Sequence, residues 1–185
     1  MQKTLTMAKK NLTYFSTFSG IGGFEIGIEQ ILPEAECVGF SEIDRYACQI
    51  YKKHFPKHKN YGDITKIKAE ELPDFDLLVG GFSCQPYSIA GKRMGLEDLR
   101  GQVIYDIFRI LKAKKPRMFL LENVKGLISH NKGETIELIC EELCNSGYAI
   151  DLEILNSKNF GVPQSRERCF FVGLRLDTVP KDMII

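Results

Sequence analysis

The chain has 185 residues, of which 44% are hydrophobic and 26% are charged. These fractions are ordinary for a globular protein, and this length suffices to bury a core and to fold as one domain. The formal net charge of +1 excludes a general electrostatic attraction to nucleic acid and leaves local patches or another chain for such contacts. No apolar run approaches the ~20 residues of a membrane span, and no secretory signal begins the chain. We therefore expect a cytoplasmic protein without membrane contact.

The six cysteines include no C-x-x-C pair, which favours a reduced, intracellular protein over a disulfide framework. Cys140 and Cys144 are one helical turn apart, but no second pair of ligands follows, so we predict no metal site. Cys37 and Cys169 lie in apolar, strand-like runs and are interpreted as small core residues.

Apolar and β-branched runs alternate with segments of helical periodicity along the chain. The predicted strands lie at residues 13–18, 36–40, 61–64, 77–80, 118–121, 149–155 and 168–173. The predicted helices lie at residues 24–32, 44–54, 103–111 and 135–145, and Asp44 is placed to cap the second of them. This alternation predicts an α/β fold with a doubly wound, mostly parallel sheet and helices on both faces.

A glycine-rich loop at residues 19–23 follows the first predicted strand and precedes the first helix. Such a loop lets backbone approach a ligand, but Glu25 stands where a dinucleotide fingerprint needs its third glycine. Glu42 follows the loop by about 20 residues, where an acid can bind a ribose diol, and Asp63 could accept from an adenine amino group. Together they predict an adenosine-bearing cofactor without a pyrophosphate, of which S-adenosylmethionine is an example. The alternative is that both acids are ordinary strand-end carboxylates.

Cys84 and Glu122 each follow an apolar strand, at the edge where open α/β sheets place their ligands. Gly80 and Gly81 allow a sharp backbone turn before the cysteine, and Pro86 stiffens the exit. A thiol beside a carboxylic acid is a workable pair for covalent attack on a heterocycle. The alternatives are a buried structural cysteine and a helix-capping or surface acid.

Two arginines, Arg166 and Arg168, stand at the start of the last predicted strand. Their planar guanidinium groups could orient a base carbonyl or a phosphate. A charged strand entry without function is the alternative.

Taken in order, six segments resemble the DNA (cytosine-5)-methyltransferase family over nearly the whole chain. They are 18–23 (FSGIGG), 42–44 (EID), 62–64 (GDI), 80–86 (GGFSCQP), 122–124 (ENV) and 164–168 (QSRER). The resemblance implies a Rossmann-like methyltransferase fold, S-adenosylmethionine as cofactor and DNA as substrate, as in restriction-modification systems.

The same resemblance implies a covalent mechanism on a cytosine that is flipped out of the duplex. Cys84 would attack C6, Glu122 would engage N3, Arg168 would hold the base carbonyl, and C5 would take the methyl group; Arg166 completes the predicted catalytic set. The implied cofactor-binding residues are Phe18, Ser19, Gly20, Gly22, Gly23, Glu42, Ile43, Asp63 and Ile64. The implied DNA contacts, on a polar loop after the cysteine, are Gln85, Ser88, Lys92 and Arg100.

Two departures from the family pattern matter. Ser83 precedes the cysteine where the family usually has proline. The family also continues, after its last catalytic strand, into a target-recognition domain and two further motifs. We therefore predict that residues 1–185 are the catalytic and cofactor-binding domain, truncated or split before the target-recognition domain. A second chain or a missing C-terminal region would be its partner. Two alternatives stay open: a non-catalytic cofactor-binding remnant or scaffold subunit, and a tRNA cytosine-5 methyltransferase.

Overall fold

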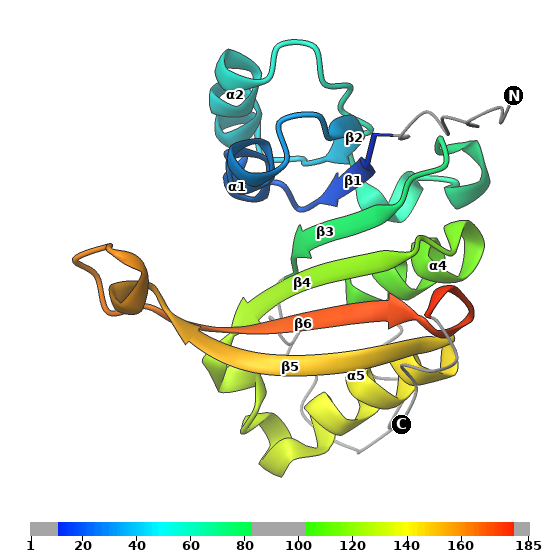
Figure 1. Cartoon of the computed structure of the whole chain (residues 1–185), viewed down its shortest axis with the longest axis vertical. Helices are drawn as coiled ribbons and strands as arrows, with labels where there is room; N and C mark the ends of the chain where they lie inside the picture. Colours follow the sequence, from blue (N-terminus) through cyan, green and yellow to red (C-terminus); the bar gives the residue numbers. More distant parts are fainter. Residues whose placement is uncertain (1–10, 83–102, 180–185) are drawn as a thin grey trace, which may run out of the picture.

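The structure is a computed structural model that describes residues 11–82 and 103–179. In these ranges six strands form one sheet in the order β2-β1-β3-β4-β6-β5 (Figure 1). The strands are β1 Thr13–Thr17, β2 Glu36–Ser41, β3 Leu77–Gly81, β4 Met118–Val124, β5 Tyr148–Asn156 and β6 Glu167–Arg175. The pairs from β2 to β4 are parallel, whereas β6 runs antiparallel to both β4 and β5. The predicted α/β fold with a mostly parallel sheet is confirmed.

In the same described ranges, four α-helices connect the strands: α1 Gly23–Ile31, α2 Arg45–His54, α4 Ile104–Lys114 and α5 Glu134–Asn145. Short 3-10 turns are η1 Ile64–Lys66, η2 Ala69–Glu71, η3 Lys125–Leu127, η4 His130–Gly133, η5 Ser157–Phe160 and η6 Leu176–Thr178. Asp44 caps α2 as predicted, because its carboxylate accepts a 2.7 Å hydrogen bond from the backbone N–H of Ala47. No helix in the described ranges is long and apolar enough to cross a membrane.

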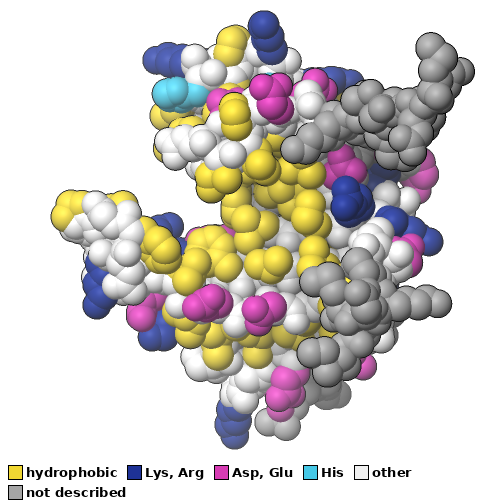
Figure 2. Space-filling model, viewed as in Figure 1, with side chains coloured by type: hydrophobic (Ala, Val, Ile, Leu, Met, Phe, Trp, Pro, Cys, Tyr) yellow, Lys and Arg dark blue, Asp and Glu magenta, His cyan; other side chains and the backbone are white. Residues whose placement is uncertain are grey.

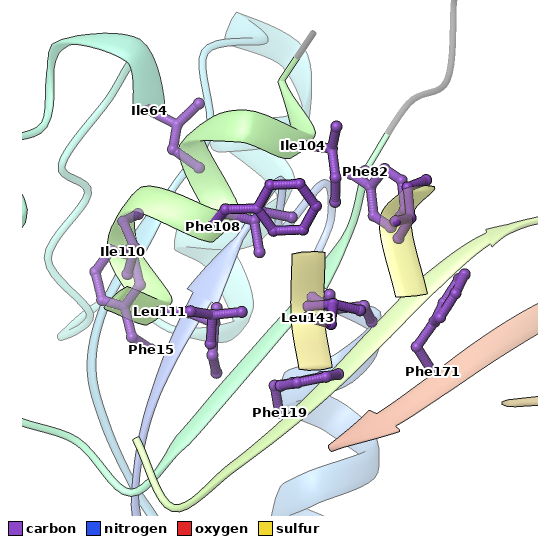
Figure 3. Packing of buried hydrophobic residues seen from close by; sticks show 14 of the residues in the cluster. Phe15, Ile64, Phe82, Ile104, Phe108, Ile110, Leu111, Phe119, Leu143 and Phe171 are labelled. Carbon is purple, nitrogen blue, oxygen red and sulfur yellow. The ribbon is translucent and has the colours of Figure 1, made fainter. Parts of the chain in front are cut away.

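The main core lies between the sheet and the two later helices, α4 and α5 (Figure 3). Every second residue of the central strands points into it, and so do the apolar stripes of the two helices. Its sheet members include Phe15, Leu78, Phe119, Leu121, Cys169 and Phe171, and its helix members include Ile107, Phe108, Leu111, Ile139 and Leu143. Cys169 is fully buried there, as predicted.

On the other face, α1 and α2 lie over the β1–β2 end of the sheet (Figure 1). Phe40 of β2 stacks on Tyr51 of α2 with ring centroids 3.8 Å apart, and Phe55 completes this smaller cluster. Helices therefore lie on both faces, as the doubly wound pattern predicts. Within residues 11–82 and 103–179, α1 and α2 cover the β1–β2 end of this second face, and no helix covers its β4–β6–β5 end (Figure 1).

The predicted strand at 61–64 is wrong. Only one isolated bridge, between Phe40 and Asn60, joins this segment to β2. Gly62 then takes a φ of +74°, which turns the chain out of the extended conformation, and Asp63 caps η1 instead of ending a strand.

Candidate active site at the carboxyl edge of the sheet

The carboxyl ends of β1, β2, β3 and β4 meet at one edge of the sheet, because these four strands are parallel. Figure 2 shows the surface hollowed on this side, between the lobe of α1 and α2 and the arm formed by the β5–β6 connection. Ligands of open α/β sheets bind outside this edge.

The glycine loop between β1 and α1 is held by a carboxylate from the end of β2. Glu42 Oε2 accepts a 2.8 Å hydrogen bond from the N–H of Gly20, and Oε1 accepts from the N–H groups of Ile43 and Asp44, also at 2.8 Å. Gly22 precedes α1 with a left-handed φ of +98°, which favours glycine. The structure thus brings together the loop and the predicted ribose-binding acid.

Several features of this loop fit a bound ligand. Phe18 has a φ of +50°, a strained conformation for a bulky residue that is often found at functional sites. The hydroxyl of Ser19 is buried without a hydrogen-bond partner, although buried polar groups are normally paired. A Cβ on Gly20 would meet no atom within 4 Å, and the side chain of Ile43 is 74% exposed. The loop therefore offers an unpaired hydroxyl and open space over backbone, and Ile43 after β2 adds an apolar side chain; these features suit an adenosine-bearing cofactor.

Asp63 lies at the start of η1, and its side chain is 32% exposed. Its Oδ1 accepts from the hydroxyl of Thr65 at 2.8 Å and from the Thr65 N–H at 3.0 Å. These hydrogen bonds hold the pKa of Asp63 below its ordinary value. Ile64, also a predicted cofactor residue, is only 4% exposed and belongs to the core, so its backbone is the part that can face a ligand.

Glu122 and Arg168 are brought into direct contact across β4 and β6. Arg168 Nε donates to Glu122 Oε1 at 2.8 Å, and the two side chains are 20% and 24% exposed. The antiparallel register aligns Val124 with Arg168, so the arginine lies on the same sheet face as Glu122, two positions along the strand. Two of the predicted catalytic residues therefore form one partly buried charge pair.

Gly80 and Gly81 serve a different purpose from the predicted one. Both lie within β3 and neither has a positive φ, so they make no sharp turn. A Cβ on Gly80 would collide with Thr17 of β1, and one on Gly81 would lie 3.1 Å from Glu122 Oε2. The glycines therefore permit close approach of neighbouring strands and leave room for the Glu122 carboxylate.

Cys84, Gln85, Ser88, Lys92 and Arg100 lie outside the described residues. The described chain stops at Phe82, two residues before the predicted nucleophile. Phe82 is 3% exposed in the core, and its carbonyl accepts a 2.8 Å hydrogen bond from the amide of the buried Asn123. Asn123, which sequence reasoning did not single out, thus links the end of β4 to the segment leading to Cys84. The sequence did offer one signal for this role, because Asn123 lies next to Glu122 in the 122–124 segment that resembles the family.

Arg166 lies apart from the charge pair, with an exposed side chain on the arm before β6. The backbone N–H of Arg166 donates to Asn156 Oδ1 at 3.2 Å, and Asn156 Nδ2 donates to Ser165 Oγ at 3.2 Å. Asn156 therefore fixes the backbone that presents both arginines, and no sequence pattern indicated this role.

Behind the glycine loop, Glu25 of α1 is completely buried. Its Oε1 accepts a 3.0 Å hydrogen bond from the hydroxyl of Tyr51, which also lies 3.1 Å from His58 Nδ1. Burial raises the pKa of Glu25 and lowers that of His58. This network joins α1 to α2 and supports the loop from behind.

Burial also raises the pKa of the Cys37 thiol to about 11, so this cysteine is a poor nucleophile. Across residues 11–82 and 103–179, no three His, Cys, Asp or Glu side chains are grouped to hold a metal ion.

The fold and this edge define a class of protein: an α/β protein with a cofactor loop and an acid–arginine pair beside it. The family model for C-5 cytosine-specific DNA methylase matches residues 12–183, so the chain belongs to this family.

The curated relatives are named as methyltransferases. The orphan methyltransferase M.Rho11sI of Bacillus phage rho11s is 50% identical over 173 residues, which cover 92% of this chain and 34% of that protein. The type II methyltransferase M.NlaX of Neisseria lactamica is 47% identical over 156 residues, covering 84% of this chain and 50% of that protein. The chain thus spans a third to a half of the length of these two relatives.

Solved structures share the architecture. The S. pombe Dnmt2 methyltransferase matches with a TM-score of 0.76 and 27% identity, over 92% of this chain and 53% of that one. An Escherichia coli prophage protein described as a putative DNA modification methyltransferase matches with a TM-score of 0.74 over 95% of this chain and 51% of that one. Its 21% identity supports the fold alone.

Proposed function

We propose that this chain is the catalytic part of an enzyme that transfers a methyl group from S-adenosylmethionine to C5 of a flipped-out cytosine in DNA. The observation that carries the proposal is the 2.8 Å contact between Glu122 and Arg168. It lies at the strand edge beside Gly81, three residues before Cys84.

In the proposed reaction the Cys84 thiolate adds to C6 of the cytosine and forms a C–S bond. Glu122 holds the proton at N3 that stabilises the electron pair displaced into the ring, and Arg168 donates to the base carbonyl. S-adenosylmethionine held by the glycine loop would supply the methyl group that becomes attached to C5, and the thioether S-adenosylhomocysteine would be left. Loss of the C5 proton and departure of the thiolate then break the C–S bond and restore the ring and the enzyme.

The cofactor would be held where the glycine loop meets the ends of β2 and the 61–64 segment. Phe18 and Ile43 would pack against the adenine, Glu42 would bind the ribose, and Asp63 would accept from the adenine amino group. The backbone of the loop, with Ser19, Gly20, Gly22, Gly23 and the backbone of Ile64, would complete the site. The buried hydroxyl of Ser19 and the open space over Gly20 support this placement.

We propose that DNA binding requires polypeptide beyond this chain, in the same protein or in a second chain. The chain spans only 34% to 50% of the two relatives described above. Its own proposed DNA contacts are Gln85, Ser88, Lys92 and Arg100, which suit phosphates.

The test is a fusion of this chain with the part of M.Rho11sI that it does not span. The fusion should form a covalent adduct with DNA that contains 5-fluorocytosine, because fluorine at C5 blocks the final proton loss. Cys84→Ala should abolish the adduct, and Glu122→Gln should slow it by about 10²–10⁴-fold, the contribution of a positioned acid or base. The matched control is Glu167→Gln, an exposed acid of β6 paired with Lys125 at 2.9 Å, which should react normally.

A fusion that binds both DNA and S-adenosylmethionine yet forms no adduct would contradict the catalytic proposal and favour a cofactor-binding remnant. Transfer of a labelled methyl group to tRNA instead of DNA would favour the tRNA alternative.

A further inference from the structure

Asn60 lies between two parts of the proposed cofactor site, the end of β2 with Glu42 and the turn that leads to Asp63. In the described sheet β2 is an edge strand. One isolated bridge, between Phe40 and Asn60, joins the next segment to it. Gly62 then turns the chain away with a φ of +74°. The backbone pairing between the two segments therefore ends before it reaches either acid.

The side-chain amide of Asn60 makes four hydrogen bonds at this point. Its Nδ2 donates to the carbonyl oxygen of Glu42 at 3.0 Å and to Cys48 Sγ of α2 at 3.3 Å. Its Oδ1 accepts from the backbone N–H of Gly62 at 2.8 Å and from that of Glu42 at 3.3 Å. An amide has two N–H donors and an oxygen with two lone pairs, so each hydrogen-bonding position of this side chain is used. An aspartate of the same shape lacks the donors, and a leucine lacks both donors and acceptors.

These bonds connect three segments of the cofactor site. The backbone of Glu42 is held at both its N–H and its carbonyl, and the carboxylate of the same residue accepts from the N–H of Gly20 at 2.8 Å. Gly62, the residue before Asp63, is held at its N–H by the amide and at its carbonyl by the hydroxyl of Ser41, which donates at 2.7 Å. The amide therefore sets how far the Asp63 turn lies from Glu42 and from the glycine loop.

A fixed separation of the two acids matters for the proposed ligand. The ribose diol and the adenine amino group of an adenosine lie at opposite ends of a rigid unit, so both can be bound only when the two acids are correctly spaced. A site that already has this spacing loses less conformational freedom on binding and gains affinity. Asn60 itself is half-buried, and its amide is used entirely by the protein, so it acts through its neighbours.

We propose that Asn60 is a positioning residue that fixes the separation of Glu42 and Asp63 and thereby raises the affinity for the adenosine half of the cofactor. The inference rests on the proposed function, and it adds a determinant of cofactor affinity that does not touch the cofactor.

The experiment measures binding of S-adenosylmethionine to the full chain by calorimetric titration. Asn60→Asp keeps the shape and the acceptors of the side chain but removes both donors, and Asn60→Leu removes all four hydrogen bonds without adding a charge. We expect each variant to lose about tenfold in affinity, the effect of a few lost hydrogen bonds. The affinity for S-adenosylhomocysteine, which has the same adenosine half, should fall by the same factor for Asn60→Leu.

Tyr148→Phe is the matched control for lost stability. It removes a buried 2.8 Å hydrogen bond from the Tyr148 hydroxyl to the carbonyl of Pro116, on the strand at the opposite edge of the described sheet. Its free energy of unfolding should fall while its affinity for S-adenosylmethionine equals that of the parent. Circular dichroism should show that all variants keep the fold.

A double-mutant cycle with Asp63→Ala separates positioning from a general loss of stability. Because Asn60 acts partly by holding Asp63, Asn60→Leu should lower the affinity less in the Asp63→Ala protein than in the parent chain. Strict additivity in this cycle would overturn the proposal. So would parent-like affinity of both Asn60 variants, equal weakening by Tyr148→Phe, or a parent chain that binds neither ligand.

A kinetic measurement on the fusion described above adds a second criterion. Asn60→Leu should raise KM for S-adenosylmethionine and leave kcat for methyl transfer to DNA unchanged, because it removes binding that ground state and transition state share. A fall in kcat with KM unchanged would contradict the positioning role. Adduct formation by the fusion, with parent-like cofactor binding by the Asn60 variants, would leave the proposed function standing while this proposal fails. Weakened binding by the variants without any adduct from the fusion would give the reverse result.

Discussion

Gly22 offers the sharpest test of how the glycine loop is built. Its φ of +98° is left-handed, and a Cβ there would lie 2.5 Å from Cε2 of Phe55. That ring is 5% exposed and stacks against His58 with centroids 5.0 Å apart, so it has little room to move. For Gly22→Ala, a left-handed L-residue costs about 1–2 kcal/mol and overpacking adds about 1–3 kcal/mol. Their sum predicts a loss of about 2–5 kcal/mol in the free energy of unfolding.

Gly23→Ala is the matched control in the adjacent position. Gly23 begins α1, has no left-handed φ, and a Cβ there would meet nothing within 4 Å. Alanine should therefore be neutral or should stabilise the protein by about 0.4–1 kcal/mol through the unfolded chain. Urea denaturation followed by circular dichroism measures both variants. The reasoning is refuted if Gly22→Ala unfolds within about 0.5 kcal/mol of the parent, or if both substitutions destabilise equally.

Two further predictions concern buried and cofactor-facing carboxylates. Burial raises the pKa of Glu25 above its ordinary value of 4.5. Above pH 4.5 the unfolded chain therefore loses the Glu25 proton while the folded protein still keeps it. The free energy of unfolding consequently falls as the pH rises. Glu25→Gln should remove this dependence, so its stability relative to the parent should be greater at about pH 8 than at about pH 5 in urea denaturation; a constant difference would contradict the assignment. Glu42→Ala should weaken S-adenosylmethionine binding about 10–100-fold in calorimetric titration, the loss of hydrogen bonds to a charged acceptor. Glu36→Ala, at the exposed start of β2, should bind as the parent does, and equal affinities for all three proteins would exclude Glu42 from the cofactor site.

Local patterns in the sequence predicted most of the fold because strands and helices leave short-range signatures. Asp44 was recognised as a cap from its place before a helical run, and the structure confirms its hydrogen bond to Ala47. The exception at 61–64 arose because apolar content alone does not make a strand. The positive φ of Gly62 and the single bridge at Asn60 decide that segment.

Some residues of the candidate site could likewise be predicted from local sequence patterns, and others could not. The sequence alone could indicate Glu42, Glu122 and Arg168, because each lies next to the end of a strand that is predicted from the apolar pattern. Asn123 and Asn156 could not, because their roles depend on reaching Phe82 and Arg166 from other strands. The reason for two glycines at the end of β3 was likewise hidden, since it lies in the closeness of Thr17 and Glu122.

The sequence by itself determined most of the order of strands and helices, the family resemblance and the residue types available for chemistry, because these depend on local periodicity and on motif spacing. Only the tertiary structure decided that Glu122 meets Arg168 and that Glu42 holds the glycine loop. It also decided that α4 and α5 cover one sheet face while α1 and α2 lie on the other. Those features come from strand register and from contacts between residues far apart in the chain, which no local pattern encodes.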